Sequence, residues 1–217
     1  MKKAIIILVA VFGFSAAKAQ VTIKPGVRGG LNLSKFTNSD TNFKPDFFVG
    51  GSVAIKFVKF YTLQPEITYS RQGAKVVQYS YPTDVTFDPI ISGRRTEQKF
   101  SLDYLSVGIM NKFTFKGFQV LVGPSFDFKV ADDFVSNYSE TPIGFDLALV
   151  AGVGYQFSNG IGVDLRFKQG MMDIFGNNYE TTYYDDNGNY YDDNGNYDDV
   201  ILNQVIQLGL SYTFDLK

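Results

Sequence analysis

One segment of the chain gathers oxygen-bearing side chains at a regular spacing. The stretch Tyr-Tyr-Asp-Asp-Asn-Gly-Asn occurs at residues 183–189 and again at 190–196. Within it, four side chains follow one another at a spacing that collects hard oxygen ligands, as Ca²⁺ sites do: Asp185, Asn187, Asn189 and Asp192. It is not an EF-hand, because the glycine comes too early and no Glu follows at the twelfth position. An acidic hairpin turning at the two Asn-Gly steps is the favoured interpretation, and a Ca²⁺ or Mg²⁺ site is the alternative.

A second set of charged residues recurs inside extended segments, always on the polar side of an alternating pattern. Its members carry charges of both signs: Arg28, Glu66, Lys112, Asp127, Asp146, Asp164 and Arg166. An unpaired charge removed from water costs several kcal/mol, so we expect these side chains to form a network of ion pairs. A structural role is the favoured interpretation of this network, and a proton or ion path is the alternative.

The residue types that most enzymes use are missing. The chain has no His and no Cys, which removes the commonest general base, the commonest metal ligand and any disulfide. No Ser or Thr lies in a recognisable catalytic arrangement. The sequence therefore predicts a protein that is not an enzyme and needs no cofactor, and it disfavours a lipid-modifying enzyme of the outer membrane.

The elements that must carry these residues alternate between apolar and polar positions. Between Phe118 and Lys129 nearly every second residue is apolar, which predicts a strand with two different faces. The same pattern predicts strands at eight places: 25–36, 46–57, 61–72, 100–115, 118–129, 145–157, 161–169 and 202–214. No comparable segment has helical periodicity, so the chain is expected to be all-β.

Short and long connections between these strands alternate strictly. The long, polar ones fall at 37–45, 73–99, 130–144 and 170–201. An up-and-down arrangement places all of them at one end, as outer-membrane barrels do. We therefore expect an eight-stranded antiparallel up-and-down transmembrane β-barrel with short periplasmic turns and long extracellular loops.

Alternation alone does not say which face meets lipid, because a soluble lipocalin-like barrel has the same period. The polar face is rich in glycine, including Gly30, Gly50, Gly123 and Gly152. A narrow barrel needs small residues in its interior, whereas a face turned to water does not. This composition favours an apolar face in lipid and a polar face inside the barrel.

The N-terminus resembles a secretory signal. Lys2 and Lys3 precede an apolar run, and Ala17-Lys18-Ala19 gives a cleavage site. We expect residues 1–19 to be a signal peptide and residues 20–217 to be one barrel domain. Without its three lysines the basic count falls from 20 to 17, against 22 acidic residues. A negative chain gives no electrostatic case for nucleic acid.

Several short motifs follow one another along nearly the whole mature chain. They lie at 26–34, 63–74, 103–107, 122–124, 152–155 and 208–214. Together they resemble the PorT-like outer-membrane β-barrel proteins of Bacteroidota. The resemblance implies a barrel in the outer membrane, and the member that gives the family its name is linked to type IX secretion.

Taken together, these patterns predict a monomeric scaffold that contacts outer-membrane lipid. Its extracellular loops would meet an extracellular or envelope protein or a glycan, above all through the acidic repeat at about 170–201. One alternative is a narrow or gated channel for small solutes or ions. Another is a component associated with an outer-membrane secretion system, and a soluble periplasmic lipocalin-like binder is a further one.

Overall fold

The structure is a computed structural model that describes seven stretches of the chain. They are residues 21–39, 41–80, 94–133, 141–176, 182–184, 190–192 and 200–215. The expected signal peptide lies outside these residues. Within them, no helix is both long enough and apolar enough to cross a membrane.

The chain forms one large antiparallel sheet and one small hairpin. The large sheet has nine strands: β1 (Thr22–Phe36), β2 (Thr41–Asn42), β3 (Lys44–Val58), β4 (Tyr61–Ser80), β5 (Arg94–Phe115), β6 (Phe118–Asp132), β7 (Phe145–Gln156), β8 (Ile161–Gly170) and β11 (Asn203–Thr213). The hairpin pairs β9 (Thr182–Tyr184) with β10 (Tyr190–Asp192).

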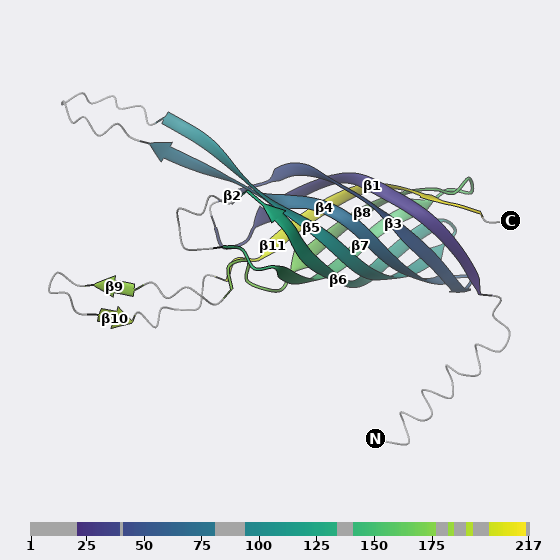
Figure 1. Ribbon diagram of the computed structural model, residues 1–217. Helices are drawn as coiled ribbons and strands as arrows, with labels where there is room; N and C mark the ends of the chain where they lie inside the picture. Colours follow the sequence, from purple (N-terminus) through teal and green to yellow (C-terminus); the bar gives the residue numbers. More distant parts are fainter. Residues whose placement is uncertain are drawn as a thin grey trace, which may run out of the picture.

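The large sheet closes on itself as a barrel. Its order is β2-β4-β3-β1-β11-β8-β7-β6-β5, and β4 also pairs with β5, which joins the two sides (Figure 1). The first and last long strands, β1 and β11, are hydrogen-bonded neighbours from Gly26 opposite Thr213 to Phe36 opposite Asn203. Such closure leaves no long unpaired edge in the wall.

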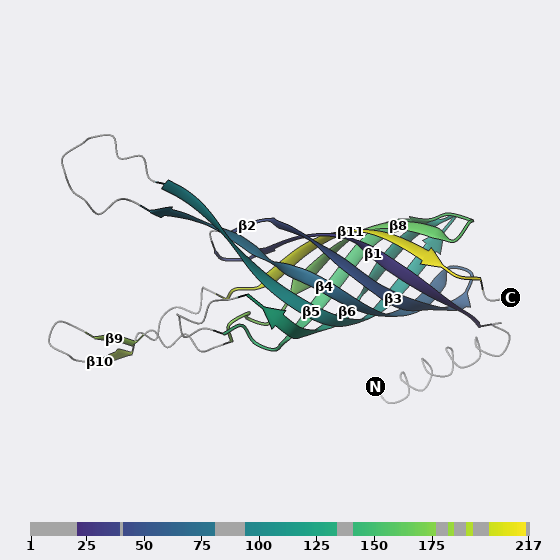
Figure 2. The same cartoon turned by 45° about the horizontal axis from the view of Figure 1, so that its top comes forward.

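The two ends of the barrel differ. Tight turns join β3 to β4, β5 to β6 and β7 to β8 at one end, where β1 also begins and β11 ends (Figure 2). The turn between Phe115 and Phe118 consists of Lys116 and Gly117, with φ values of 49° and 89°. Positive φ at both central residues is the two-residue turn that fits the twist of a hairpin. We call this the short-turn end and the other the long-loop end.

The two faces of the wall have opposite character. Large apolar side chains on alternate positions are exposed on the outside, among them Leu31, Val49, Ile67, Leu165 and Leu208. The intervening positions point inward, where polar and charged side chains are buried. Water-soluble barrels have the reverse distribution, so the expected direction of the two faces agrees with the structure.

Close packing of the strands accounts for glycine on the inner face. A Cβ at Gly50 would lie 2.2 Å from the carbonyl oxygen of Ile67 on β4 and 2.6 Å from the Cα of Thr68. A Cβ at the outward-facing neighbour, Gly51, would have nothing nearer than 3.8 Å. The backbone approach at Gly50 thus excludes even a methyl group.

Two sequence-based expectations require correction. The segment 73–99 is not a loop throughout, because β4 continues to Ser80 and β5 begins at Arg94, and both project beyond the barrel in Figure 1. The sheet also has a ninth strand, β2, whose two residues pair with Lys75 and Val76. Backbone hydrogen bonds hold this extension, and they leave little trace in the apolar pattern.

Candidate functional site

The barrel interior contains a compact group of four charged residues, which we call the cross-lumen cluster: Arg28, Glu66, Asp164 and Arg166. Arg166 donates two hydrogen bonds to Glu66, from Nη1 to Oε2 at 2.7 Å and from Nη2 to Oε1 at 3.1 Å. Its Nε donates to Asp164 Oδ1 at 2.7 Å. A planar guanidinium suits this paired geometry.

This cluster spans the barrel. Glu66 lies on β4 and Arg166 on β8, and these strands are four neighbours apart whichever way the ring is followed. Arg28, on β1 between them, donates from Nη2 to Asp164 Oδ1 at 3.1 Å, and its Nη1 lies 3.5 Å from Glu66 Oε2. Two cations therefore balance two carboxylates on a line across the interior.

Lys112 joins this cluster through a neutral side chain. Gln64 donates from Nε2 to Glu66 Oε1 at 2.7 Å, and its Oε1 accepts from Lys112 Nζ at 3.0 Å. Lys112 is 7 % exposed. Glu66 thereby orients the Gln64 amide so that its oxygen faces the buried ammonium group.

Asp127 and Asp146 lie apart from the cross-lumen cluster. Asp127 is paired with Lys168 and accepts from Ser125 Oγ at 2.7 Å. Asp146 accepts from the backbone N–H groups of Met171 and Met172 at 3.3 and 3.2 Å. It therefore fixes the start of the connection that follows β8.

Neutral polar side chains form a further layer toward the long-loop end. Asn32 donates to Ser70 Oγ at 3.0 Å and to the backbone oxygen of Arg71 at 2.8 Å, and it accepts from Gln207 Nε2 at 2.9 Å. Asn203 donates to Gln72 in the same region. These bonds connect β11, β1 and β4 across the interior.

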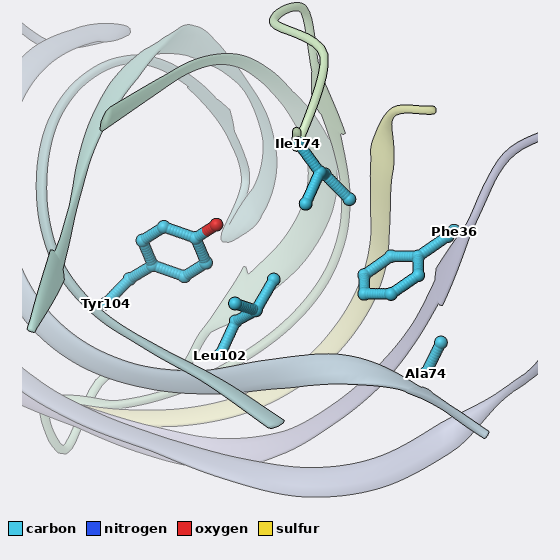
Figure 3. Close-up of a cluster of buried hydrophobic side chains, with 5 residues drawn as sticks. All are labelled: Phe36, Ala74, Leu102, Tyr104 and Ile174. Atoms are coloured by element: carbon cyan, nitrogen blue, oxygen red, sulfur yellow. The ribbon is translucent and has the colours of Figure 1, made fainter. Parts of the chain in front are cut away.

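Apolar side chains close the long-loop end of the interior. Phe36, Ala74, Leu102, Tyr104 and Ile174 are buried together and point toward one another in Figure 3; we call them the end cluster. Ile174 comes from the connection after β8, whose backbone bonds to Ile143 and Ile201 hold it in place. A smaller apolar group, Met110, Leu121 and Val150, lies on the inner face of β5, β6 and β7.

The short-turn end contains a cavity of about 210 Å³. Residues from β1, β3, β4, β5, β6 and the end of β7 line it, together with the turn after β7 and the C-terminal end of β11. Among the described residues that line it, Lys24, Lys56 and Lys112 are basic and Asp215 alone is acidic. We call it the short-turn cavity.

The structure does not test the predicted cation site. Asp185, Asn187 and Asn189 lie outside the described residues, and only the backbone of Asp192, the last residue of β10, is described. Among the described residues, no group of three or more carboxylates is arranged to hold a metal ion.

The charge network proposed from the sequence did not include three residues of the interior. Lys168 pairs with Asp127, Gln64 connects Lys112 to Glu66, and the buried ring of Phe48 lies 4.4 Å from the Arg28 guanidinium carbon. Lys168 and Gln64 could have been found from the sequence, because they occupy polar positions of the alternating pattern and such positions point inward. Phe48 does not, because it is flanked by apolar Phe47 and Val49.

A closed antiparallel barrel with exposed apolar positions and a polar interior defines a membrane barrel. The sequence profile of the outer membrane protein beta-barrel domain matches residues 18–176. The chain belongs to this family, and we place it in the outer membrane.

The chain is also similar to two proteins of known structure. Neisserial surface protein A is 12 % identical over 88 % of this chain and 97 % of its own, with a TM-score of 0.44. Ail, the attachment invasion locus protein of Yersinia pestis, is 13 % identical in its complex with the heparin analogue sucrose octasulfate, over 88 % and 99 % of the two chains, with a TM-score of 0.47. No curated protein matches the chain in sequence.

Proposed function

We propose that this protein is a closed, non-enzymatic barrel that serves as a scaffold for the segments at its long-loop end. The observation that carries the proposal is that side chains fill the middle and the long-loop end of the interior. The cross-lumen cluster joins opposite walls, and the end cluster covers the long-loop end above it. Both are buried, so side chains occupy the space that a diffusion pore needs.

The number of strands and the orientation belong to the same proposal. Eight strands form the ring, and β2 is an extension of two residues at its rim. The short-turn end faces the periplasm and the long-loop end faces outward, as short periplasmic turns are the rule in this architecture. We also propose that the barrel is monomeric and that residues 1–19 are removed on export.

The ion pairs of the interior have a structural role in this proposal. Every carboxylate of the cross-lumen cluster accepts from at least one arginine. A conducting path needs charged groups in contact with mobile water, and these four side chains are each 8 % exposed or less. A narrow channel remains the alternative function.

Conductance across a planar bilayer tests this proposal. The full mature chain, folded in detergent and inserted, should give no stepwise current at moderate voltage. The variant E66Q provides a second reading, because a path that depends on Glu66 would change its current when that carboxylate is neutralised. Regular single-channel steps from the wild-type protein would contradict the scaffold function and support the channel function.

The outward segments are the proposed contact region for an envelope protein, an extracellular protein or a glycan. The backbone N–H of Ile174 bonds to the oxygen of Ile201 at 2.9 Å, so the chain on either side of residues 177–199 already lies together. A short glycine linker in place of these residues should leave the barrel intact and remove partner binding. Unchanged binding would assign the contact to the β4–β5 hairpin instead.

We also propose that the chain belongs to the narrower group of PorT-like proteins. The motifs at 63–74 and 208–214 support a PorT-like member of Bacteroidota. A component associated with an outer-membrane secretion system is the alternative role that this relationship suggests. A cation site at Asp185, Asn187, Asn189 and Asp192 likewise stays a proposal for the acidic repeat.

A further inference from the structure

The charges of the described residues around the short-turn cavity do not balance. Within this part of the chain three lysines line the cavity, against the single carboxylate of Asp215. Lys24 is paired with that carboxylate. Among the described residues, no carboxylate lies within ion-pair distance of Lys56 or Lys112. Two ammonium groups of this cavity therefore lack a counter-ion within the described chain.

Lys112 is the more unusual of the two because it is buried. Its ammonium group has three N–H donors, and Gln64 Oε1 is the acceptor found for it in the described part of the chain. The neighbouring cross-lumen cluster does not supply the missing charge, since its two arginines and two carboxylates already balance. A buried cation with unused donors costs free energy unless an anion or ordered water meets it.

The strand register places these groups in a row. Lys56 on β3 lies opposite Thr62 on β4, and Thr62 lies opposite Lys112 on β5. Neighbouring strands are about 4.8 Å apart, so the two lysine backbones are separated by roughly 10 Å with a hydroxyl between them. Side chains of this length reach a small anion from both sides.

The size of the cavity limits its ligand. At about 210 Å³ it is smaller than the roughly 300–1,000 Å³ of pockets that enclose drug-sized molecules. It has room for several water molecules, each of which needs at least about 10–15 Å³. A tetrahedral oxyanion with part of its hydration shell fits this space and these donors.

We propose that the short-turn cavity binds a phosphate group, held by Lys56, Thr62 and Lys112. A free phosphate ion and the headgroup of a phospholipid beside the barrel rim share this chemistry. The site is independent of the loops at the opposite end and of any partner that they contact.

Calorimetric titration with inorganic phosphate tests the site, using the full mature protein folded in a phosphate-free maltoside detergent at low salt. Wild-type protein should bind saturably, with chloride as the comparison anion. K112M should weaken binding about tenfold or more, because it removes a charge-assisted hydrogen bond. The matched control is K59M, since Lys59 lies in a turn at the same end but does not line the cavity.

Folding of each variant is checked by heat-modifiable migration on a gel. K112M should fold, because the four charges of the neighbouring cross-lumen cluster balance without it; if it does not, K56M gives the test from an exposed position. Absence of saturable phosphate binding, or equal weakening by K59M and the cavity variants, would overturn the site.

Nanodiscs distinguish the two sources of phosphate. Titration in discs of phosphatidylglycerol should show no added binding if a lipid headgroup already occupies the cavity. Binding equal to that in maltoside identifies the free ion. Both results require a phosphate site, and they differ in what fills it in the membrane.

Discussion

At the scale of single residues, Glu66 connects two opposite walls of the interior, and it contacts two arginines at once. It accepts two hydrogen bonds from Arg166 and one from Gln64, and Arg28 lies within ion-pair distance. These donors come from β8, from β1 and from its own strand. Neutralising Glu66 would leave two buried arginines facing a single carboxylate.

We expect E66Q to lower the free energy of unfolding by about 3–5 kcal/mol, the usual effect of removing one partner from a buried ion pair. Unfolding by urea in lipid vesicles gives the measurement. D215N is the matched control, because Asp215 is exposed and its pair with Lys24 is a surface contact, worth less than about 1 kcal/mol. Equal stability of E66Q and D215N would show that the cluster does not hold the wall together.

The alternation rule predicted which charged residues point inward, but it could not predict which of them meet. Glu66 and Arg166 are separated by 100 residues and lie on opposite walls. Their meeting depends on the stagger between successive strands, which alternation does not encode. For the same reason Asp127 pairs with Lys168, a partner that no local spacing indicates.

At the scale of elements, the eight long strands were predictable because each satisfies two constraints at once. An apolar outer face and a small or polar inner face impose a strict period of two, as in β6 and β8. The alternation rule did not predict the extension of β4 and β5, because this extension lies beyond the residues at which β2 pairs with β4 and β6 pairs with β5. Past Val77 and Glu97 the two strands pair only with each other among the described residues, so no second neighbouring strand constrains the sequence there.

Gly50 and Gly51 allow a test of strand packing with a matched control in adjacent positions. We expect G50A to cost about 3 kcal/mol or more, at the upper end of what overpacking costs, because the new methyl group would overlap the backbone of Ile67 and Thr68. G51A places the same group on the outer face, where the nearest atom, the backbone oxygen of Gly26, is 3.8 Å away. Heat-modifiable migration should be reduced in G50A and normal in G51A; equal behaviour would contradict the register between β3 and β4.

At the scale of the whole molecule, the outer surface is organised in rows that cross several strands. Leu31, Leu208 and Leu165 lie side by side on β1, β11 and β8, and each is at least 50 % exposed. A water-soluble protein rarely leaves such a row of apolar side chains exposed. Lipid is the solvent in which an apolar outer surface and a charged interior are both stable.

Replacing outward-facing residues by lysine tests whether the outer surface faces lipid. Leu208 is near the middle of β11, whereas Ile161 begins β8 at the short-turn end. In a bilayer, L208K should lower the free energy of unfolding by about 2–4 kcal/mol and I161K by about 0–1 kcal/mol, because the cost of a cation falls toward the interface. Urea unfolding in vesicles compares the two variants. If the row faced water, neither lysine would be costly and the difference between the two depths would vanish, so a graded loss of stability specifies lipid as the surroundings of this barrel.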